Sequence, residues 1–366
     1  MQRAPWYAWR TEMSRFFSEK YNKLVPYVPG EQPKERKYIK LNTNESPFAP
    51  SPRAVAYAAK AAESLQLYSD PECRTLLPKM AEFYGVSTKE ILLTNGSDEI
   101  LNFAFMAFCD DKTPAAFADI TYGFYKVFAA LNNVPFVEIP LREDFTLNTA
   151  DYMGIGKTIF IANPNAPTGI ALTRAEIEQI LIANPNNVVV IDEAYVDFGA
   201  ESCVPLVHKY KNLLVTQTFS KSRSLAGGRL GFGIACEELI ADLNTIKYST
   251  NPYNVNAMTM AAGVGTMEDG EYTRKNCETV MENRAYLAAE LKNMGFSLTD
   301  SKTNFLFAAH PEISGEIIYT ALREKGILVR HFTAPKIANY NRITIGTRAQ
   351  MEALVAAMRE ILEEQL

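Results

Sequence analysis

The sequence contains little that would bind a metal, form disulfides or enter a membrane. Its three histidines share no metal-ligand spacing, and its five cysteines are scattered without a CxxC pair, so neither a zinc site nor a disulfide framework is indicated. No stretch approaches the roughly 18 apolar residues of a membrane span. Arg3, Arg10 and Glu12 leave no uninterrupted apolar core for a signal peptide. We therefore expect a cytoplasmic protein with no metal ion and no membrane attachment.

An excess of positive charge is also missing. The formal net charge is −5 and the two signs are interspersed, whereas a nucleic-acid binder usually shows a basic patch or stripe. The 366 residues exceed the roughly 250–300 at which a single hydrophobic core stops growing. With 47% hydrophobic and 22% charged residues, the composition is that of a globular protein. We expect two domains and no nucleic-acid partner.

The middle of the chain alternates strand-like and helix-like patterns. Three short runs are nearly continuously apolar, and they span residues 157–162, 188–191 and 213–216. Such runs are typical of parallel strands that are buried on both faces. Between the first two, Thr173 followed by Glu176 forms a capping-box pattern, which predicts a helix over residues 172–183. This order predicts a βαβ unit in an α/β domain with a large, mostly parallel sheet.

The C-terminal part of the chain has a different pattern. We expect helices over residues 271–294 and 315–325, strands over 304–308, 327–330 and 342–345, and a last helix capped by Thr347 and Gln350. Strands mixed with covering helices predict a smaller α+β domain. The expected division is 1–44 as an N-terminal arm and part of the small domain, 45–265 as the large domain, and 266–366 as the small C-terminal domain.

The N-terminal arm concentrates large apolar side chains. They recur at helical spacing and are Trp6, Trp9, Met13, Phe16 and Phe17. The pattern favours an amphipathic arm that covers the body of its own subunit. Packing on a partner subunit is the alternative, and a membrane-surface helix is less favoured because the polar face has no basic excess.

Three polar segments each follow a predicted strand. They are residues 163–169 (NPNAPTG), 192–198 (DEAYVDF) and 218–232 (TFSKSRSLAGGRLGF). In an open α/β sheet, ligands bind at the carboxyl ends of the strands. The three segments can therefore converge on one crevice.

Four residues in these segments suit one kind of chemistry. A lone lysine such as Lys221 is usually a solvated charge, and Asp192 alone could be a turn residue. However, a lysine that is buried near cations can form a Schiff base with an aldehyde, and Arg229 offers a planar fork to a phosphate. Asp192 could keep a pyridine nitrogen protonated, so that the ring becomes an electron sink. Tyr195 could donate a hydrogen bond to a ring hydroxyl.

These motifs resemble those of fold-type-I aminotransferases that use pyridoxal 5′-phosphate. The resemblance rests on DEAY, the SK-x₇-R spacing and NPNAPTG. Further segments resemble the histidinol-phosphate aminotransferases: LVPYVPG (24–30), LNTNESP (41–47), YSDP (68–71), NGSDE (95–99), TYG (121–123), GILVR (326–330) and RITIGTR (342–348). The resemblance runs in the family's order from about residue 22 to the C-terminus.

The resemblance implies a role for each matched residue. Lys221 holds the cofactor covalently and moves protons, Asp192 pairs with the ring nitrogen, and Tyr195 bonds the ring oxygen. The implied cofactor-binding residues are Ser97, Asp98, Tyr122, Asn165, Asp192, Tyr195, Thr218, Ser220, Lys221, Arg229 and Tyr68. Within this set, Tyr122 stacks on the ring, and Ser97 and Asp98 donate to the phosphate at a helix N-terminus. Tyr68 reaches the site of the neighbouring subunit, which implies a homodimer.

One position departs from the family's pattern. Relatives usually have asparagine directly before Pro-Thr-Gly, where this chain has Ala166. Either Asn165 takes over the hydrogen bond to the ring hydroxyl through a shifted turn, or Tyr195 holds that oxygen alone. We favour Asn165 at this point.

The resemblance also implies the substrates. They are histidinol phosphate and 2-oxoglutarate, which are converted to imidazole acetol phosphate and glutamate in histidine biosynthesis. Arg342 would bind the α-carboxylate of glutamate and Arg330 the substrate phosphate, with Tyr27 and Asn44 also at the substrate. Aromatic amino acid aminotransferases and threonine-phosphate decarboxylases share this fold and remain alternatives. A non-enzymatic regulatory module is disfavoured because the lysine is kept and no DNA-binding segment is added.

Overall fold

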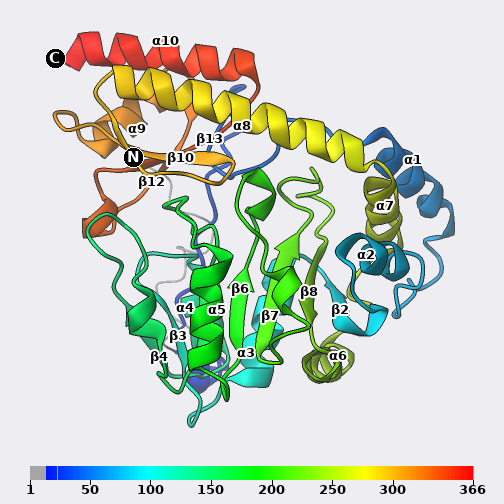
Figure 1. The fold of residues 1–366 in the computed structure, drawn as a ribbon. Helices are drawn as coiled ribbons and strands as arrows, with labels where there is room; N and C mark the ends of the chain where they lie inside the picture. The colour runs from blue at the N-terminus through cyan, green and yellow to red at the C-terminus, as the bar shows by residue number, and fades with distance from the viewer. Residues whose placement is uncertain (1–13, 23, 366) are drawn as a thin grey trace.

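The computed structural model describes residues 14–22 and 24–365. Its larger sheet consists of β2 Ile91–Thr94, β3 Ala115–Ala118, β4 Phe136–Ile139, β5 Thr158–Ala162, β6 Val189–Asp192, β7 Leu213–Thr218 and β8 Gly231–Ala235. In the described chain these strands lie in the order β2-β8-β7-β6-β5-β3-β4 (Figure 1). The strands β3 to β7 run parallel, whereas β8 is antiparallel to both of its neighbours. The expected large, mostly parallel sheet is confirmed.

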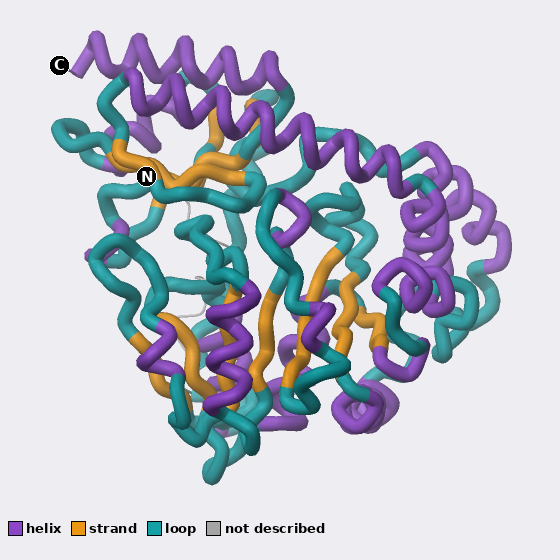
Figure 2. The backbone as a smooth tube through the Cα atoms, viewed as in Figure 1, coloured by secondary structure: helices purple, strands orange, loops and turns teal. Residues whose placement is uncertain are grey.

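Helices cover both faces of this sheet (Figure 2). One face packs against α2 Leu77–Tyr84, α5 Arg174–Ala183 and α7 Ala257–Glu268, and the other against α3 Ser97–Phe108, α4 Phe124–Leu131 and α6 Glu237–Thr250. α1 Pro52–Ala61 packs on α7. Side chains alternate between faces along a strand. Val189 and Ile191 of β6 therefore pack on the side of α2, α5 and α7, whereas Val190 packs on the side of α3, α4 and α6. This double burial explains the continuously apolar strands.

A smaller antiparallel sheet lies in the C-terminal part of the chain. Its strands are β9 Ser297–Leu298, β10 Phe305–Ala309, β12 Arg330–His331 and β13 Asn341–Thr344, in the order β12-β13-β10-β9. The helices α8 Gly270–Asn293, α9 Gly315–Glu324 and α10 Arg348–Gln365 share its core, and α8 and α10 run side by side (Figure 1). β1 Ile39–Lys40 pairs in parallel with β11 Ile327–Leu328. The domain boundaries at residues 44 and 265 remain a prediction.

The predicted βαβ unit is confirmed, and one strand prediction is wrong. β5 and β6 pair in parallel, and α5 begins after Thr173 with the expected capping box to Glu176. Residues 327–330, however, form two short strands, because β11 pairs with β1 while β12 pairs with β13. An apolar run shows that a segment is extended but not which neighbour it pairs with, so the break was not visible in the sequence.

The described part of the N-terminal arm is not an α-helix. Residues 14–18 form turns and bends, and only η2 Glu19–Tyr21 makes a single 3₁₀ turn. Phe16 is 80% exposed, so it does not cover the body of its own subunit. Trp6, Trp9 and Met13 lie outside the described residues. Within 14–22 and 24–365, no helix is both long and apolar enough to cross a membrane.

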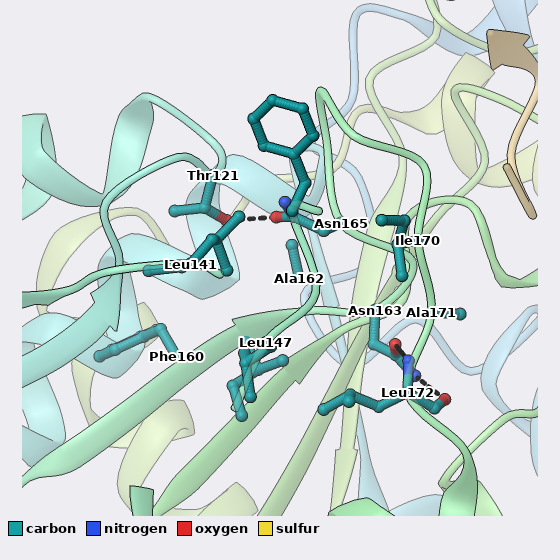
Figure 3. A pocket seen from close by; sticks show the side chains of 13 residues that line it. Thr121, Leu141, Leu147, Phe160, Ala162, Asn163, Asn165, Ile170, Ala171 and Leu172 are labelled. Carbon is teal, nitrogen blue, oxygen red and sulfur yellow. Dashed lines mark hydrogen bonds between the residues drawn. The ribbon is translucent and has the colours of Figure 1, made fainter. Parts of the chain in front are cut away.

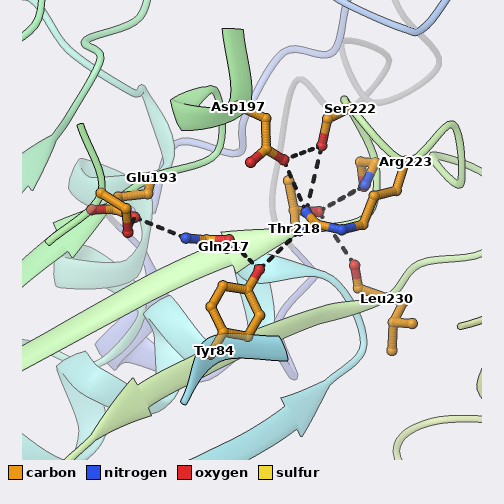
Figure 4. A network of polar contacts seen from close by, with 10 residues as sticks. Tyr84, Glu193, Asp197, Gln217, Thr218, Ser222, Arg223 and Leu230 are labelled. Carbon is orange, nitrogen blue, oxygen red and sulfur yellow. Dashed lines mark hydrogen bonds and ion pairs between the residues drawn. The ribbon is translucent and has the colours of Figure 1, made fainter. Parts of the chain in front are cut away.

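A chain of polar side chains is buried beside the carboxyl ends of β6 and β7 (Figure 4). Arg223 donates to the Tyr84 hydroxyl at 2.8 Å, and this hydroxyl donates to Gln217 Oε1 at 2.7 Å. Gln217 Nε2 then donates to Glu193 at 2.8 Å, and Arg223 also pairs with Asp197 at 3.0 Å. Arginine only donates and carboxylate only accepts, so each bond has a fixed direction. The chain therefore connects a buried cation to a buried anion and holds two loops together.

We predict that Tyr84→Phe destabilises the protein. The change removes one hydroxyl but leaves Gln217 Oε1 and one Arg223 donor unpaired, which should cost about 1–3 kcal/mol of the free energy of unfolding. Tyr152→Phe is the matched control, because the Tyr152 hydroxyl is buried and has no hydrogen-bond partner among the described residues. Urea denaturation of both variants should show a loss only for Tyr84→Phe. Equal effects would mean that the chain contributes nothing beyond packing.

Candidate active site

A cavity of about 340 Å³ opens at the carboxyl ends of β5, β6 and β7, beside the N-terminus of α3. Most of the predicted cofactor-binding residues line it: Ser97, Asp98, Tyr122, Asp192, Tyr195, Thr218, Ser220, Lys221 and Arg229. The parallel strands bring these loops together because their carboxyl ends share one edge of the sheet. The three polar segments of the sequence thus meet as expected.

Lys221 lies in the loop that follows β7, and its ammonium group faces the cavity. Its Nζ donates to the carbonyl oxygen of Thr43 at 3.4 Å, which is long for such a bond. The same nitrogen lies 5.6 Å from the centre of the Tyr195 ring. No carboxylate of the described chain forms an ion pair with Lys221, so this nitrogen is available for a ligand.

Asp192 ends β6 as a buried carboxylate, with 5% of its surface exposed. It accepts from the Tyr125 hydroxyl at 2.9 Å and the Ala194 N–H at 3.3 Å, and Thr216 lies at 3.5 Å. All of these donors are neutral. Burial raises the pKa of Asp192 to about 6 against these hydrogen bonds. A cation placed at this carboxylate would relieve the cost of burying its charge.

The N-terminus of α3 forms a cradle together with Arg229. Gly96 precedes the helix at φ 78°, and a Cβ atom there would lie 2.3 Å from an Arg229 nitrogen. Arg229 pairs with Asp98 at 2.9 Å, and the Tyr122 hydroxyl donates to the same carboxylate at 2.6 Å. The Asp98 side chain therefore orders other groups, and only its backbone N–H can donate to an anion. The free N–H groups of the helix suit a phosphate.

The residues of this cavity fit pyridoxal phosphate. The phosphate would bind at the α3 N-terminus with Thr218, Ser220 and Arg229. The Thr218 hydroxyl lies 2.9 Å from the Ser220 hydroxyl, and Ser220 lies 3.5 Å from Arg229. The ring nitrogen of the cofactor would lie at Asp192, and the aldehyde carbon of the cofactor would lie at Lys221.

Asn165 does not face this cavity, which corrects our interpretation of the departure at Ala166. Its amide donates to the Ile120 carbonyl and the Thr168 hydroxyl, both at 3.0 Å, and accepts from Thr121 at 2.7 Å. Asn165 lines a separate, small cavity of about 20 Å³ instead (Figure 3). Ala166 lines the larger cavity. The consecutive residues Asn165 and Ala166 face different cavities. The shifted turn that would bring Asn165 to the ring hydroxyl in place of residue 166 therefore does not occur.

Two arginines lie near this cavity without being part of its lining. Arg342 donates to the Asn42 carbonyl at 3.1 Å, while its buried Nε has no partner among the described residues. Arg330 makes a long contact of 3.5 Å to the Val28 carbonyl, and its guanidinium lies 5.9 Å from the centre of the Phe332 ring. Neither arginine has a carboxylate partner in ranges 14–22 and 24–365. Burial lowers the pKa of Arg342, so an anion there would be strongly favoured.

Tyr27 stands close to both arginines. Its ring stacks on Phe124 at 4.2 Å and lies 6.5 Å from the Tyr122 ring. Burial raises the pKa of the Tyr27 phenol, and the charges of Arg330 and Arg342 oppose that rise. Tyr27 thus lies close enough to both arginines for their charges to act on its phenol.

The predicted site residues Tyr68 and Asn44 differ in burial, since Tyr68 is exposed and Asn44 is buried. Tyr68 is 84% exposed and stacks on Tyr253 at 4.7 Å, outside the cavity of its own subunit. Asn44 is 1% exposed, and Tyr195 and Thr344 occupy its side chain. Both polar atoms of its side chain thus have protein partners and Asn44 is not among the residues that line the cavity, so its role at the substrate stays a prediction.

The sequence analysis missed three polar residues of the site. Tyr125 donates to Asp192 from a helix whose apolar face gave no sign of a polar role. Thr43 and Glu45 line the cavity and belong to a motif that we quoted without assigning them. Although burial works to raise it, the pKa of Glu45 is lowered by hydrogen bonds from Lys40 and Thr43 and by the charge of Lys221.

Comparisons with known proteins show the family and the fold of this chain. The model of the family "Aminotransferase class I and II" matches residues 36–358. The histidinol-phosphate aminotransferase of Marinomonas sp. (strain MWYL1) is 49% identical and covers 95% of this chain and 100% of its own length. That of Brachyspira hyodysenteriae (strain ATCC 49526 / WA1) is 47% identical and covers 96% and 100%. The crystal structure of histidinol-phosphate aminotransferase from Sinorhizobium meliloti in complex with pyridoxal-5′-phosphate has a TM-score of 0.87 at 21% identity, over 97% of this chain and 100% of that one. The predicted fold type is confirmed.

The raised pKa of Asp192 predicts how the stability of the cofactor-free protein depends on pH. The folded state binds the proton of the Asp192 carboxyl more tightly than the unfolded state does. The stability that this proton contributes is therefore complete below pH 4 and is lost as pH rises from about 4 to about 6. Asp192→Asn removes the cost of burying a negative charge and should stabilise the cofactor-free protein at pH 8 by up to roughly 3 kcal/mol. Thermal melting at pH 8 and pH 4 checks this, and a gain of equal size at both values would contradict it.

Proposed function

The chain belongs to the class I and II aminotransferase family, and we propose that it is a cytoplasmic enzyme of histidine biosynthesis that interconverts histidinol phosphate plus 2-oxoglutarate with imidazole acetol phosphate plus glutamate. The cofactor is pyridoxal 5′-phosphate. The observation that carries this choice of substrates is the pair Arg330 and Arg342, two cations without carboxylate partners in the described chain beside the Lys221 cavity. Both substrates are anions, and a guanidinium fork matches phosphate and carboxylate alike.

The bound cofactor supplies an electron sink for the negative charge that develops on the substrate carbon. Asp192 maintains that sink, because its buried carboxylate favours a protonated ring nitrogen. Tyr122 would cover the ring, and Tyr195 would donate to the ring oxygen. Lys221 would hold the cofactor, and its Nζ is the base that would remove and return the proton at the substrate carbon.

The two amino donors enter one pocket in turn. Glutamate carries two carboxylates and no phosphate, whereas histidinol phosphate carries a phosphate and no carboxylate. We assign the α-carboxylate of glutamate to Arg342, whose buried Nε is unpaired in the described structure, and the phosphate to Arg330. The rings of Tyr27, Tyr122 and Phe124 cluster beside these arginines and suit the imidazole of the substrate.

The same aromatic cluster supports a second candidate function. Tyr27 and Phe124 would accept a phenyl or phenol ring as readily as an imidazole, so aromatic amino acids are the second candidate substrates. Threonine phosphate offers no ring to this cluster and is disfavoured. Assaying histidinol phosphate, phenylalanine, tyrosine and threonine phosphate side by side separates these activities, and a preference for threonine phosphate would overturn the proposal.

The two arginines should discriminate between the donors. Arg330→Ala should reduce kcat/KM for histidinol phosphate more than for glutamate, by roughly the 1.5–3 kcal/mol of a charged hydrogen bond. Arg342→Ala should show the opposite bias. The control is Arg348→Ala, because Arg348 belongs to the same motif but pairs with Glu352 at 3.0 Å on the surface. Equal losses for both donors would mean that Arg330 and Arg342 shape the pocket without recognising the substrate.

We further propose a homodimer in which Tyr68 completes the site of the neighbouring subunit. The support is its 84% exposed ring on an exposed aromatic pair with Tyr253, where a partner subunit could cover it. Tyr68→Ala and Lys221→Ala should each be nearly inactive alone. Unfolding and refolding the two variants together should restore activity, because a mixed dimer contains one site with both Lys221 and a partner Tyr68. A mixture no more active than its parents would contradict the shared site.

A further inference from the structure

Asn44 is held at every polar atom of its backbone and side chain. Its N–H donates to the Thr344 hydroxyl at 3.0 Å, and its side-chain oxygen accepts from the same hydroxyl at 3.0 Å. Its carbonyl accepts from the Asn304 amide at 3.0 Å. The fourth contact runs from its Nδ2 to the Tyr195 hydroxyl at 2.9 Å. Asn44 has a φ of 56°, a left-handed conformation that persists only where the surroundings determine it.

The contact with Asn44 determines what Tyr195 can do. An amide nitrogen only donates, so the phenol oxygen of Tyr195 is the acceptor and its own proton stays free for the cavity. The Tyr195 ring packs edge-on against Phe305, with centroids 5.2 Å apart, so it cannot readily turn away. Since Ala166 has no polar side chain and Asn165 points elsewhere, the 163–169 segment provides no amide beside Tyr195 to share the ring oxygen.

The same contacts connect Tyr195 to the strand that carries Arg342. Thr344 follows Arg342 by two positions in β13, so both side chains lie on one face of that strand. Arg342 donates to the Asn42 carbonyl at 3.1 Å, and the Thr344 N–H donates to the Leu41 carbonyl at 2.9 Å. The segment 41–44 therefore lies between the substrate-binding strand and Tyr195.

We propose that Asn44 is a positioning residue that makes Tyr195 a hydrogen-bond donor to the cofactor and fixes it relative to Arg342. This inference rests on the proposed function and refines it, because it reassigns Asn44 from the substrate to Tyr195. Asn44 is not among the residues that line the cavity. Its effect reaches the chemistry through the direction of one phenol proton.

The test uses Asn44→Gly, since glycine adopts a φ of 56° without strain. A phenol that donates to the ring oxygen stabilises negative charge there. Loss of its orientation should therefore raise the pH midpoint of the visible absorption of the cofactor-loaded enzyme, in the same direction as Tyr195→Phe but by less. The kcat with glutamate should fall by about tenfold to a hundredfold, while KM stays within about twofold because Arg342 is unchanged.

A double variant separates positioning from substrate binding. In a Tyr195→Phe background, Asn44→Gly should lower kcat by less than about twofold, because it then has no phenol to orient. Thr158→Val is the control for lost stability, since it removes a buried hydrogen bond to the Phe108 carbonyl far from the cavity. It should lower the melting temperature without moving the absorption midpoint.

Two results would overturn the inference. One is an unchanged absorption midpoint in Asn44→Gly. The other is a tenfold rise in KM with kcat retained, which would return Asn44 to substrate binding. The absorption midpoint is measured without any substrate. It therefore still tests Asn44 if histidinol phosphate proves to be the wrong substrate, and the two proposals can fail separately.

Discussion

The buried charge of Asp192 is the constraint on which the rest of the site depends. A carboxylate with 5% of its surface exposed receives only neutral hydrogen bonds within the described chain, and such a charge is costly until a cation meets it. Three cations, by contrast, have no carboxylate partner within the described chain: Lys221, Arg330 and Arg342. The protein therefore folds with charges left unbalanced, and the cofactor and substrates complete them. Stability is given up where ligands must bind.

The parallel sheet provides the geometry for this arrangement. Alternation along β6 places Asp192 toward the cofactor cavity and Glu193 toward the opposite face, where the polar chain through Gln217 and Tyr84 holds it. Each strand end thus has a reactive face and a supporting face. The supporting face contributes no chemistry, but it fixes the backbone from which the reactive side chains project.

The sequence was sufficient to predict which polar segments meet at the cavity. Lys221, Asp192 and Arg229 lie in segments that follow apolar strands, and the carboxyl ends of parallel strands share one edge of a sheet whatever the strand order. The roles of Asn165 and Asn44 could not be predicted, because they depend on side-chain direction within a turn and on partners such as Thr344, distant in sequence. Tyr125 was missed because a buried tyrosine on an apolar helix face looks the same whether it supports a core or a carboxylate.

Ala166 has no polar side chain, so a hydrogen bond that residue 166 cannot make has to come from another residue of the site. Without an amide at that position, the proposed site leaves the ring oxygen to Tyr195, whose proton would then have to point in one direction. Such a direction cannot be set by the phenol itself, since its hydroxyl both donates and accepts. It must come from a neighbour that only donates, and Asn44 Nδ2 is placed at 2.9 Å to do so. The neighbour in turn needs a fixed position, which Thr344 supplies from the strand of Arg342. In the proposed site, the hydrogen bond that Ala166 cannot make to the cofactor is thus replaced by a chain of bonds from Tyr195 through Asn44 to the strand of Arg342.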